Sequence, residues 1–283
     1  MGKIGIILVN YNGLEDTIEC INSIYKSTYK DYEIIVVDNN SEKCPTILET
    51  YTNVTLVKLN ENVGFGIANN IGAEKAINHG AQYILCLNND TEISMGLLSM
   101  FVNEIKEKEV LTCATYYYSN KKELWYGGGE ISKIRGTCRQ KQYTKERYVS
   151  FICGCCMFFS AETYDEIGLF EPEYFMYCED SDYSLKLILN GYQIRYLVKE
   201  SVYHKVGKSI SREPGLKEYY LTRNRMFFLK KYSNYFYPSV WIYFYITRLL
   251  MILVNAIKGY NSKSIFEGMK DFKRGNMLKK ASL

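Results

Sequence analysis

Short apolar runs alternate with stretches of helical periodicity through the first third of the chain. Four apolar runs predict strands, at 4–10, 33–38, 55–59 and 83–87. The spacing of apolar residues over 14–26 and 64–78 predicts two helices between these strands. Strands that alternate with helices are typical of an α/β fold, in which helices cover both faces of a mostly parallel sheet. We therefore predict a Rossmann-like architecture for this part of the chain.

Polar residues follow the end of each predicted strand. They form the runs Asn10-Tyr11-Asn12, Asp38-Asn39-Asn40-Ser41, Asn60-Glu61-Asn62 and Asn88-Asn89-Asp90. The carboxyl ends of parallel strands meet at one edge of the sheet, and the ligands of such folds bind beyond that edge. The sequence therefore predicts a polar, ligand-binding rim built from four strand ends.

The second half of the chain has a less regular pattern. It predicts a glycine-punctuated hairpin over 125–140, strands at 152–159, 193–198 and 202–206, and helices at 179–190 and 217–232. Gly191 is suited to end the first of these helices, whose first turn is acidic. Acidic residues at a helix start also complement the helix dipole, so their position alone does not indicate catalysis.

The composition is that of an ordinary globular protein. The chain has 283 residues, 47% of them hydrophobic and 23% charged, and its net charge of +4 gives no support to nucleic-acid binding. Nine cysteines without a recognisable secretory signal favour reduced thiols in the cytosol. Cys153, Cys155 and Cys156 resemble half of a zinc site, but no second half accompanies them, so we expect small buried residues in a packed strand.

The C-terminal segment, 233–283, differs in character. Residues 240–257 are apolar except for Thr247, Arg248 and Asn255, and 258–283 carries seven basic against two acidic residues. A spanning helix needs about 20 apolar residues, and Arg248 would be costly at its centre. We predict a peripheral or monotopic helix in the headgroup region of the anionic inner leaflet, on the cytoplasmic face of the plasma membrane. The alternative is a helix packed on the domain.

Asp38 ends a strand where a carboxylate can accept hydrogen bonds from a nucleoside. Gly64-Phe65-Gly66 follows this acid instead of preceding it, and lacks the third glycine of a dinucleotide-binding loop. The sequence also contains no P-loop, so NAD-dependent and P-loop enzymes are disfavoured. Asp90 is a natural ligand for Mg²⁺ or Mn²⁺, although a single Asp after a strand often caps a helix instead.

Seven motifs, in one order, resemble those of family 2 glycosyltransferases. They are Val9-Asn10-Tyr11-Asn12, Val37-Asp38-Asn39-Asn40-Ser41, Asn62-Val63-Gly64-Phe65-Gly66 with Ala68 and Asn70, Leu87-Asn88-Asn89-Asp90, Gly154 with Met157, Glu179-Asp180-x-Asp182, and His204. The resemblance covers about residues 3 to 232, and the chain looks most like the bacterial rhamnosyltransferase-like branch that builds surface polysaccharides.

This resemblance implies a GT-A fold, a nucleotide-sugar donor, a divalent cation (Mg or Mn) and inversion at the anomeric carbon. The expected roles follow from the matched motifs. They are Asn10, Tyr11, Asn12, Asp38, Asn62 and Gly64 for the nucleotide; Asn88, Asn89 and Asp90 for the sugar and diphosphate; Asp90 and His204 for the metal; Asp180 as general base; and Glu179 and Asp182 for the acceptor. Asn88 stands where the family often has Asp, which removes a negative charge beside the cation.

The expected organisation is a GT-A domain over 1–232, with a nucleotide-binding half up to about 115 and an acceptor half after it, followed by the membrane-associated segment. The donor would be dTDP-rhamnose or a UDP-hexose, and the acceptor a lipid-linked oligosaccharide of a capsule or O-antigen type. Two alternatives are a domain that binds a nucleotide or glycan without turnover, and a membrane-peripheral scaffold in polysaccharide assembly. The intact acidic set Asp90, Glu179 and Asp180 favours the enzyme.

Overall fold

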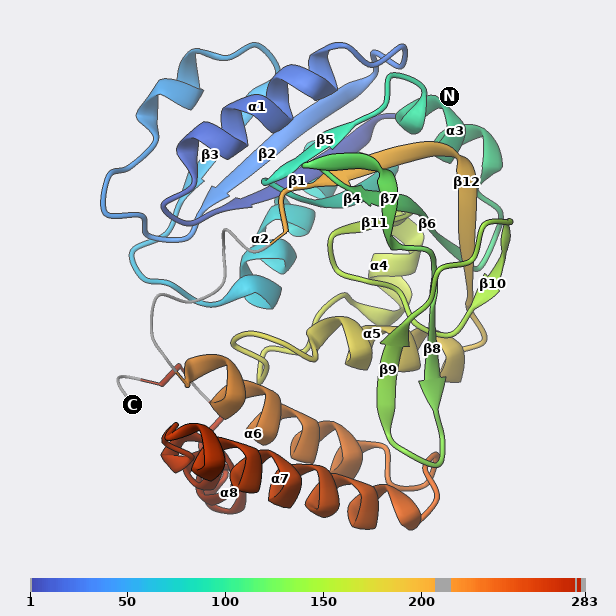
Figure 1. The fold of residues 1–283 in the computed structure, drawn as a ribbon. Helices are drawn as coiled ribbons and strands as arrows, with labels where there is room; N and C mark the ends of the chain where they lie inside the picture. The colour runs from blue at the N-terminus through green and yellow to red at the C-terminus, as the bar shows by residue number, and fades with distance from the viewer. Residues whose placement is uncertain (1, 207–214, 278, 281–283) are drawn as a thin grey trace.

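A computed structural model describes residues 2–206, 215–277 and 279–280. Within these residues, ten strands form one central mixed sheet, and two more form a separate hairpin (Figure 1). The sheet strands are β1 (Ile4–Asn10), β2 (Tyr32–Asp38), β3 (Val54–Lys58), β4 (Tyr83–Asn88), β5 (Thr91–Ile93), β6 (Glu109–Tyr117), β7 (Asn120–Tyr126), β10 (Arg147–Val149), β11 (Cys156–Ser160) and β12 (Gln193–His204); the hairpin is β8 (Gly129–Ser132) and β9 (Thr137–Gln140).

The helices lie between and after these strands. They are α1 (Leu14–Tyr25), α2 (Phe65–Asn78), α3 (Leu97–Glu104), α4 (Ala161–Ile167), α5 (Glu179–Leu189), α6 (Leu216–Lys231), α7 (Ser239–Lys258) and α8 (Lys263–Arg274), with a short 3-10 helix at Thr46–Thr50. The six elements predicted in the first third of the chain are present, with ends that differ by a residue or so.

The strand order places the predicted rim at one edge of the sheet. The order is β10-β12-β6-β11-β4-β1-β2-β3, and β3, β2, β1 and β4 are mutually parallel. Asn10 pairs with Asp38, and Val9 with Asn88, so three strand ends are in register. β11 runs antiparallel between β4 and β6, and continues the sheet into the second half of the chain.

Helices cover both faces of the sheet, as the alternation of strands and helices predicts. Ile6 and Leu8 of β1 join one buried core with apolar residues of α1 and α3. Ile7, on the other face, joins a second core with residues of α2 and α5. Because neighbouring residues of a strand point to opposite faces, near-continuous apolar runs are needed where both faces are buried. The α/β fold and its sheet are thus confirmed.

Two predicted strands differ in the structure. β11 begins at Cys156, because residues 152–155 form a loop that contacts other elements before the strand starts. Gln193–His204 is one strand with a register shift between Leu197 and Ser201, where two strands were predicted. Cys153, Cys155 and Cys156 are buried and free, and no cluster of metal ligands includes them in the described part of the chain.

The C-terminal helices form a further layer below the sheet (Figure 1). Leu229 of α6 packs in one apolar core with Val240 and Phe244 of α7. The hairpin reaches this layer, where Ser239 Oγ donates to the Ile134 carbonyl at 2.9 Å. Tyr219 OH of α6 donates to Asp271 of α8 at 2.8 Å. The segment after residue 232 therefore packs against α6 and the hairpin, and the proposed division of the chain at 232 stays a prediction.

Candidate active site

Asn10 and Asp38 hold two strand ends of the rim together. Asn10 Nδ2 donates to Asp38 Oδ1 (2.7 Å), while Asn10 Oδ1 accepts from Gly13 N (3.2 Å) and Thr17 Oγ1 (3.0 Å). Asp38 also accepts from the backbone N and the Oγ of Ser41. Both side chains are buried. Asn10 therefore acts within the protein, where it fixes Asp38 and the turn before α1.

Asn39 and Asn62 shape the loop that leads into α2. Asn39 Oδ1 accepts from Val63 N (2.9 Å), and Asn62 Oδ1 accepts from Asn39 Nδ2 (3.0 Å) and Gly64 N (3.0 Å). Gly64 has φ 90°, and a Cβ on it would lie 2.2 Å from the Phe175 carbonyl oxygen. Only glycine fits there. Asn39 was not predicted as a site residue, although its place in the polar run after Asp38 is a usable signal.

Tyr11 and Asn12 are the exposed members of the rim. The Tyr11 side chain is 53% exposed. Asn12 adopts φ 54°, and its Oδ1 accepts from Glu42 N at 2.8 Å. This hydrogen bond joins the loops after β1 and β2, and the exposed Tyr11 directly follows Asn10, the partner of the buried Asp38. That Tyr11 contacts a base stays a prediction.

The end of β4 brings Asn88, Asp90 and His204 together. His204 Nε2 lies 3.1 Å from Asp90 Oδ1 and 3.4 Å from Asn88 Nδ2. The antiparallel pairing of β5 with β12 produces this contact by placing Thr91 opposite His204. Trp125 packs edge-on against His204, with ring centroids 4.6 Å apart. The two residues predicted to bind metal are thus in contact, although they are distant in the sequence.

This donor set fits a divalent cation that is shared with substrate phosphates. Asn88 Oδ1 and His204 Nδ1 are buried and have no hydrogen-bond partner among the described residues. Mg²⁺ and Mn²⁺ take carboxylate oxygens, and are often held by one or two protein ligands plus phosphate oxygens. The described residues contain no group of three or more His, Cys, Asp or Glu side chains that could enclose an ion. Asp90 and His204 would therefore supply part of the coordination. Asn89 contacts α1 instead, where it donates to Thr17 Oγ1 at 2.8 Å.

Asp180 and Glu179 begin α5. Asp180 Oδ2 accepts from Gly154 N (3.4 Å) and Oδ1 from Ser181 Oγ (3.3 Å). Burial raises the pKa of Asp180 to about 6, although part of its surface stays accessible to water. Glu179 is buried, and its pKa is raised to about 8 by burial and then by the charge of Asp180. A carboxylate that titrates near neutrality is suited to accept a proton at physiological pH.

A single loop connects the rim with Asp180. The carbonyl of Cys155 accepts from Asn88 N at 3.0 Å, and the adjacent residue, Gly154, donates its N–H to Asp180. A Cβ on Gly154 would meet the Phe65 ring at 3.4 Å and the Asp180 Cβ at 3.7 Å. The start of α5, the start of α2 and the end of β4 therefore meet at two adjacent residues, Gly154 and Cys155.

Asp182 does not fit the acceptor role expected of it. Its side chain is 1% exposed. Tyr174 OH donates to Oδ2 (2.9 Å), and Lys231 Nζ (2.9 Å) and Tyr232 OH (3.0 Å) donate to Oδ1. These partners tie α5 to the end of α6, so Asp182 stabilises the helix pair. An acceptor contact by Glu179 stays a prediction.

Three polar residues of α6, Thr222, Arg223 and Asn224, are buried, which the basic composition of the helix did not indicate. Arg223 is fully buried, and its Nε donates to Asn224 Oδ1 at 2.9 Å. Arg225 is half-buried and donates to the Arg135 carbonyl at 2.8 Å. Asn224 was not predicted as a site residue. The signal for it is the run of four polar residues at 222–225, which interrupts the aromatic and aliphatic middle of the helix.

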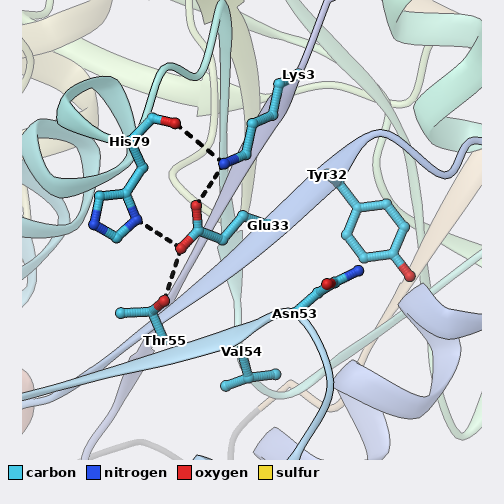
Figure 2. Close-up of a pocket in the computed structure, with 7 residues that line it drawn as sticks. All are labelled: Lys3, Tyr32, Glu33, Asn53, Val54, Thr55 and His79. Carbon is cyan, nitrogen blue, oxygen red and sulfur yellow. Dashed lines mark hydrogen bonds and ion pairs between the residues drawn. The ribbon is translucent and has the colours of Figure 1, made fainter.

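A second polar cluster lies at the other edge of the sheet (Figure 2). Lys3, Thr55 and His79 all contact Glu33 and, with their neighbours, line a surface pocket of about 520 Å³. Lys3 precedes β1 and Glu33 lies near the start of β2, so seven-residue strands separate this pocket from the rim by about 20 Å. Hydrogen bonds from these partners lower the pKa of Glu33 against the effect of burial. The cluster joins strand starts and takes no part in the candidate site.

Comparisons with known proteins agree with this arrangement. The model of glycosyl transferase family 2 matches residues 5–168, more than half of the chain. An uncharacterised glycosyltransferase of Rickettsia typhi is 25% identical over 85% of this chain and 79% of its own length. Poly-β-1,6-N-acetyl-D-glucosamine synthase of Staphylococcus epidermidis is 25% identical over 68% of this chain, which spans 47% of that relative.

The fold also matches solved structures. The mannosyltransferase PcManGT from Pyrobaculum calidifontis, in complex with GDP-Man and Mn²⁺, has a TM-score of 0.61 at 14% identity, over 98% of this chain and 87% of its own. At this identity the likeness concerns the fold alone. With the family match and the convergence of the strand-end rim, the His204–Asp90 pair and Asp180, it leads to one conclusion: the chain is a glycosyltransferase of family 2, with a GT-A fold.

Proposed function

We propose that this glycosyltransferase moves a sugar from a nucleoside diphosphate to a hydroxyl of a growing, lipid-linked cell-surface polysaccharide, with inversion at the anomeric carbon. The observation that carries the proposal is the loop at 152–155. In this loop, Cys155 accepts a hydrogen bond from Asn88, at the proposed diphosphate end of the rim. The adjacent Gly154 donates a hydrogen bond to Asp180, the candidate base. A donor on the rim and an acceptor hydroxyl at Asp180 would then be neighbours.

The proposed reaction is one in-line displacement. The acceptor oxygen forms a bond to the anomeric carbon as the bond from that carbon to the diphosphate breaks, and the nucleoside diphosphate leaves with the electron pair. Asp180 takes the proton of the attacking hydroxyl. One displacement inverts the configuration and needs a single base, unlike the paired carboxylates of a retaining reaction. The raised pKa of Asp180 supports this role, because a base titrating near pH 6 is ionised at neutral pH and still accepts a proton.

The donor would lie along the rim. Asp38, held in place by Asn10 and Ser41, is suited to the nucleoside, and the exposed Tyr11 ring to the base. Asp90 and His204 would hold a divalent cation, which when bound would neutralise charge on the leaving diphosphate. The Mn²⁺ and nucleotide sugar in the PcManGT structure support a cation and a donor of this class. We propose dTDP-rhamnose or a UDP-hexose as the donor, and the named product of the Staphylococcus epidermidis relative supports a polysaccharide acceptor.

Helix α7 supports a location at the membrane surface. It is the one helix in the described part of the chain that is long and apolar enough to cross a membrane, and only 11% of its most apolar stretch is buried inside the protein. Its exposed apolar residues recur at helical spacing: Ile242, Tyr245, Ile246, Leu249, Leu250, Leu253, Val254 and Ile257. Arg248, on the opposite side, donates to the buried Thr222 Oγ1 of α6 at 3.0 Å. A spanning position would break this contact, so we infer that α7 lies along the surface with its apolar stripe inserted.

Basic residues of α8 and its flanks fit an anionic leaflet. Lys258, Lys263, Lys270, Lys273 and Arg274 are exposed, while Ser264, Ile265 and Gly268 pack inward. Each basic residue near an anionic membrane adds about 1 kcal/mol of attraction. A lipid-linked acceptor would present its sugar at this surface.

A donor panel tests the reaction. The purified protein is combined with UDP-, dTDP- and GDP-sugars and with a lipid-linked oligosaccharide acceptor, with and without Mn²⁺, and thermal stability, nucleotide release and product anomer are measured. We expect one donor to raise the melting temperature, with a larger rise when Mn²⁺ is present; a ligand at 100 times its Kd contributes about 2.7 kcal/mol. A product that keeps the donor's anomeric configuration, or no binding and no transfer with any donor, would contradict the proposal.

Vesicle flotation tests the location. Wild-type protein should float with vesicles that contain phosphatidylglycerol and much less with phosphatidylcholine alone. Leu249→Glu combined with Leu253→Glu should abolish flotation on both, while Met95→Glu, at a 60% exposed apolar residue outside α7, should leave it unchanged. Equal flotation of the stripe variant and the wild type would refute the proposed surface.

A further inference from the structure

The two residues directly before α5, which carries the candidate base Asp180, adopt an uncommon backbone conformation. Tyr177 has φ 68° and Cys178 has φ 73°, so both lie in the left-handed region although neither is glycine. Residues with a Cβ rarely occupy this region, and two in succession persist only where surrounding contacts hold them. Glu179 and Asp180 follow at once, as the first residues of α5. The direction of the Asp180 side chain therefore depends on whatever holds this turn.

Asn224 of α6 holds the turn at Tyr177 and Cys178 in place. This side chain is fully buried, and its Nδ2 donates to the carbonyls of both Met176 (2.8 Å) and Tyr177 (2.9 Å). Its Oδ1 accepts from Arg223 Nε at 2.9 Å. A primary amide has two donor hydrogens, and both are used here. The contact with Arg223 fixes the amide orientation, because the flipped amide would place its oxygen against two carbonyl oxygens.

The segment before the turn is anchored separately. Phe65 N, at the start of α2, donates to the Phe175 carbonyl at 3.1 Å, and the Phe175 ring stacks on Tyr220 with centroids 5.4 Å apart. After the turn, Asp182 N donates to the Cys178 carbonyl at 2.9 Å, which closes the first turn of α5. Between these two anchors, Asn224 supplies the side-chain hydrogen bonds to the Met176 and Tyr177 carbonyls.

We propose that Asn224 is a positioning residue for catalysis: it holds Met176–Cys178 in the left-handed turn that aims Asp180 at Gly154 and the rim. This inference rests on the proposed function, in which Asp180 is the base. It assigns Asn224 an effect on the chemical step and none on donor binding, since its partners belong to the turn before α5 and not to the rim.

The first experiment replaces the amide. Asn224→Asp keeps the side-chain size but removes both donor hydrogens, and Asn224→Ala removes the group. We expect kcat to fall about 10- to 100-fold, less than the 10²- to 10⁴-fold that a general base contributes, while the donor Kd by calorimetry changes less than about threefold. The matched control is Thr222→Val. Thr222 lies two residues before Asn224 on α6, and the variant loses a buried hydrogen bond from Arg248 of α7. It should keep kcat within about twofold.

The pH profile and a rescue variant separate positioning from general support of the fold. If the turn relaxes and water reaches Asp180, the acid limb of the kcat profile should move to lower pH in Asn224→Ala. Cys178→Gly makes the left-handed conformation easy to adopt, so adding it to Asn224→Ala should recover at least about a third of the lost kcat. A folded Asn224→Ala protein with wild-type kcat, or with a lowered kcat that Cys178→Gly leaves unchanged, would overturn the inference.

Asp180→Asn distinguishes this outcome from failure of the proposed function. If Asp180→Asn abolishes transfer while Asn224→Ala does not, Asp180 is the base and Asn224 does not position it. If Asp180→Asn retains transfer within about tenfold of wild type, a magnitude below the general-base range, the proposed base is wrong and the inference falls with it.

Discussion

The ends of β1 and β2 on the rim and the start of α5 contribute polar groups to the candidate site, but these two regions differ in how their polar side chains are hydrogen-bonded. Asn10 and Asn39 on the rim use both their donor and their acceptor atoms on protein partners at 2.7 to 3.2 Å. On α5, Glu179 keeps Oε2 buried without a partner among the described residues, and the two side-chain hydrogen bonds of Asp180 are long, at 3.3 and 3.4 Å.

This difference leads us to expect donor binding at the rim and proton transfer at the start of α5. A network of satisfied amides fixes the shape of a site before the ligand arrives. A buried carboxylate with few partners holds its proton more tightly and so titrates near neutral pH. We therefore expect changes at the rim to alter donor binding, and changes at the start of α5 to alter proton transfer or its dependence on pH.

The largest expected effect comes from Asp180→Asn. The amide cannot accept the acceptor proton, so kcat should fall about 10²- to 10⁴-fold. Donor Kd should stay within about threefold, because the loss is confined to the transition state. Steady-state transfer assays and donor calorimetry measure the two quantities. A matching loss of donor affinity would contradict the assignment of donor binding to the rim alone, and would place Asp180 in the donor site.

Gly64→Ala should change donor affinity, whereas Asp180→Asn should change kcat. Its left-handed backbone adds strain of about 1–3 kcal/mol to a non-glycine residue, and the new Cβ would lie 2.2 Å from the Phe175 carbonyl oxygen. We expect donor Kd to rise at least about tenfold as the rim shifts. Gly80→Ala is the matched control, because Gly80 also has positive φ (85°) but nothing lies within 4 Å of a Cβ there. It should lower stability and leave donor Kd unchanged.

The same contrast explains what the sequence could predict. Rim residues lie directly after strands with clear apolar patterns, and parallel pairing brings strand ends together whatever the details of packing. The fold and the rim therefore follow from local pattern. Even the contact between Asp90 and His204 was expected only through the resemblance, because the β5–β12 pairing that creates it joins short, weakly patterned segments.

The α5 side could not be predicted in this way. Asn224 reaches a turn that is 47 and 48 residues earlier in the chain, and Asp182 meets a lysine 49 residues later. Such contacts depend on how α6 packs against α5. The spacing of apolar residues along the chain does not predict this packing. The basic composition of α6 is typical of a solvated helix, yet Arg223 is buried. The burial of Asp182 was not foreseen for the same reason, since only tertiary packing reveals its three partners.

Asn88→Asp sharpens the comparison within the rim. It restores the acid that the family often has there, beside Asp90 and His204. Because ligand charge tunes cation affinity, the Mn²⁺ concentration for half-maximal activity should fall about three- to tenfold. Without metal, the added like charge should lower the melting temperature, so the rise on adding Mn²⁺ should become larger. Asn89→Asp is the control, since the Asn89 side chain bonds Thr17 instead; an equal effect there would show a nonspecific charge effect.

The smallest expected effect is a change in pH-dependent stability from Glu179→Gln. Burial and the neighbouring Asp180 raise the pKa of Glu179 to about 8, above its ordinary value of 4.5. The folded protein then keeps a proton that the unfolded chain releases, so the stability that Glu179 contributes is fully present below about pH 4.5 and is lost as pH rises through about 8. Glutamine stays neutral and removes this loss. Wild-type and variant should melt at nearly the same temperature near pH 5. At pH 8.5 the variant should melt at least several degrees above the wild type, since 1 kcal/mol shifts Tm by about 2–4 °C at this size.

Asp180 also has a raised pKa, so the comparison needs Asp180→Asn measured beside Glu179→Gln. Asp180→Asn should remove stability loss mainly between about pH 4 and 6, and should also lower the pKa of Glu179 by removing its charged neighbour. In Glu179→Gln, kcat should keep its acid limb near pH 6, because the base itself is unchanged. Identical melting curves for wild type and Glu179→Gln across this range would mean that Glu179 is solvated or paired. The contrast between the hydrogen-bonded rim amides and the poorly partnered carboxylates of α5 would then rest on Asp180 alone.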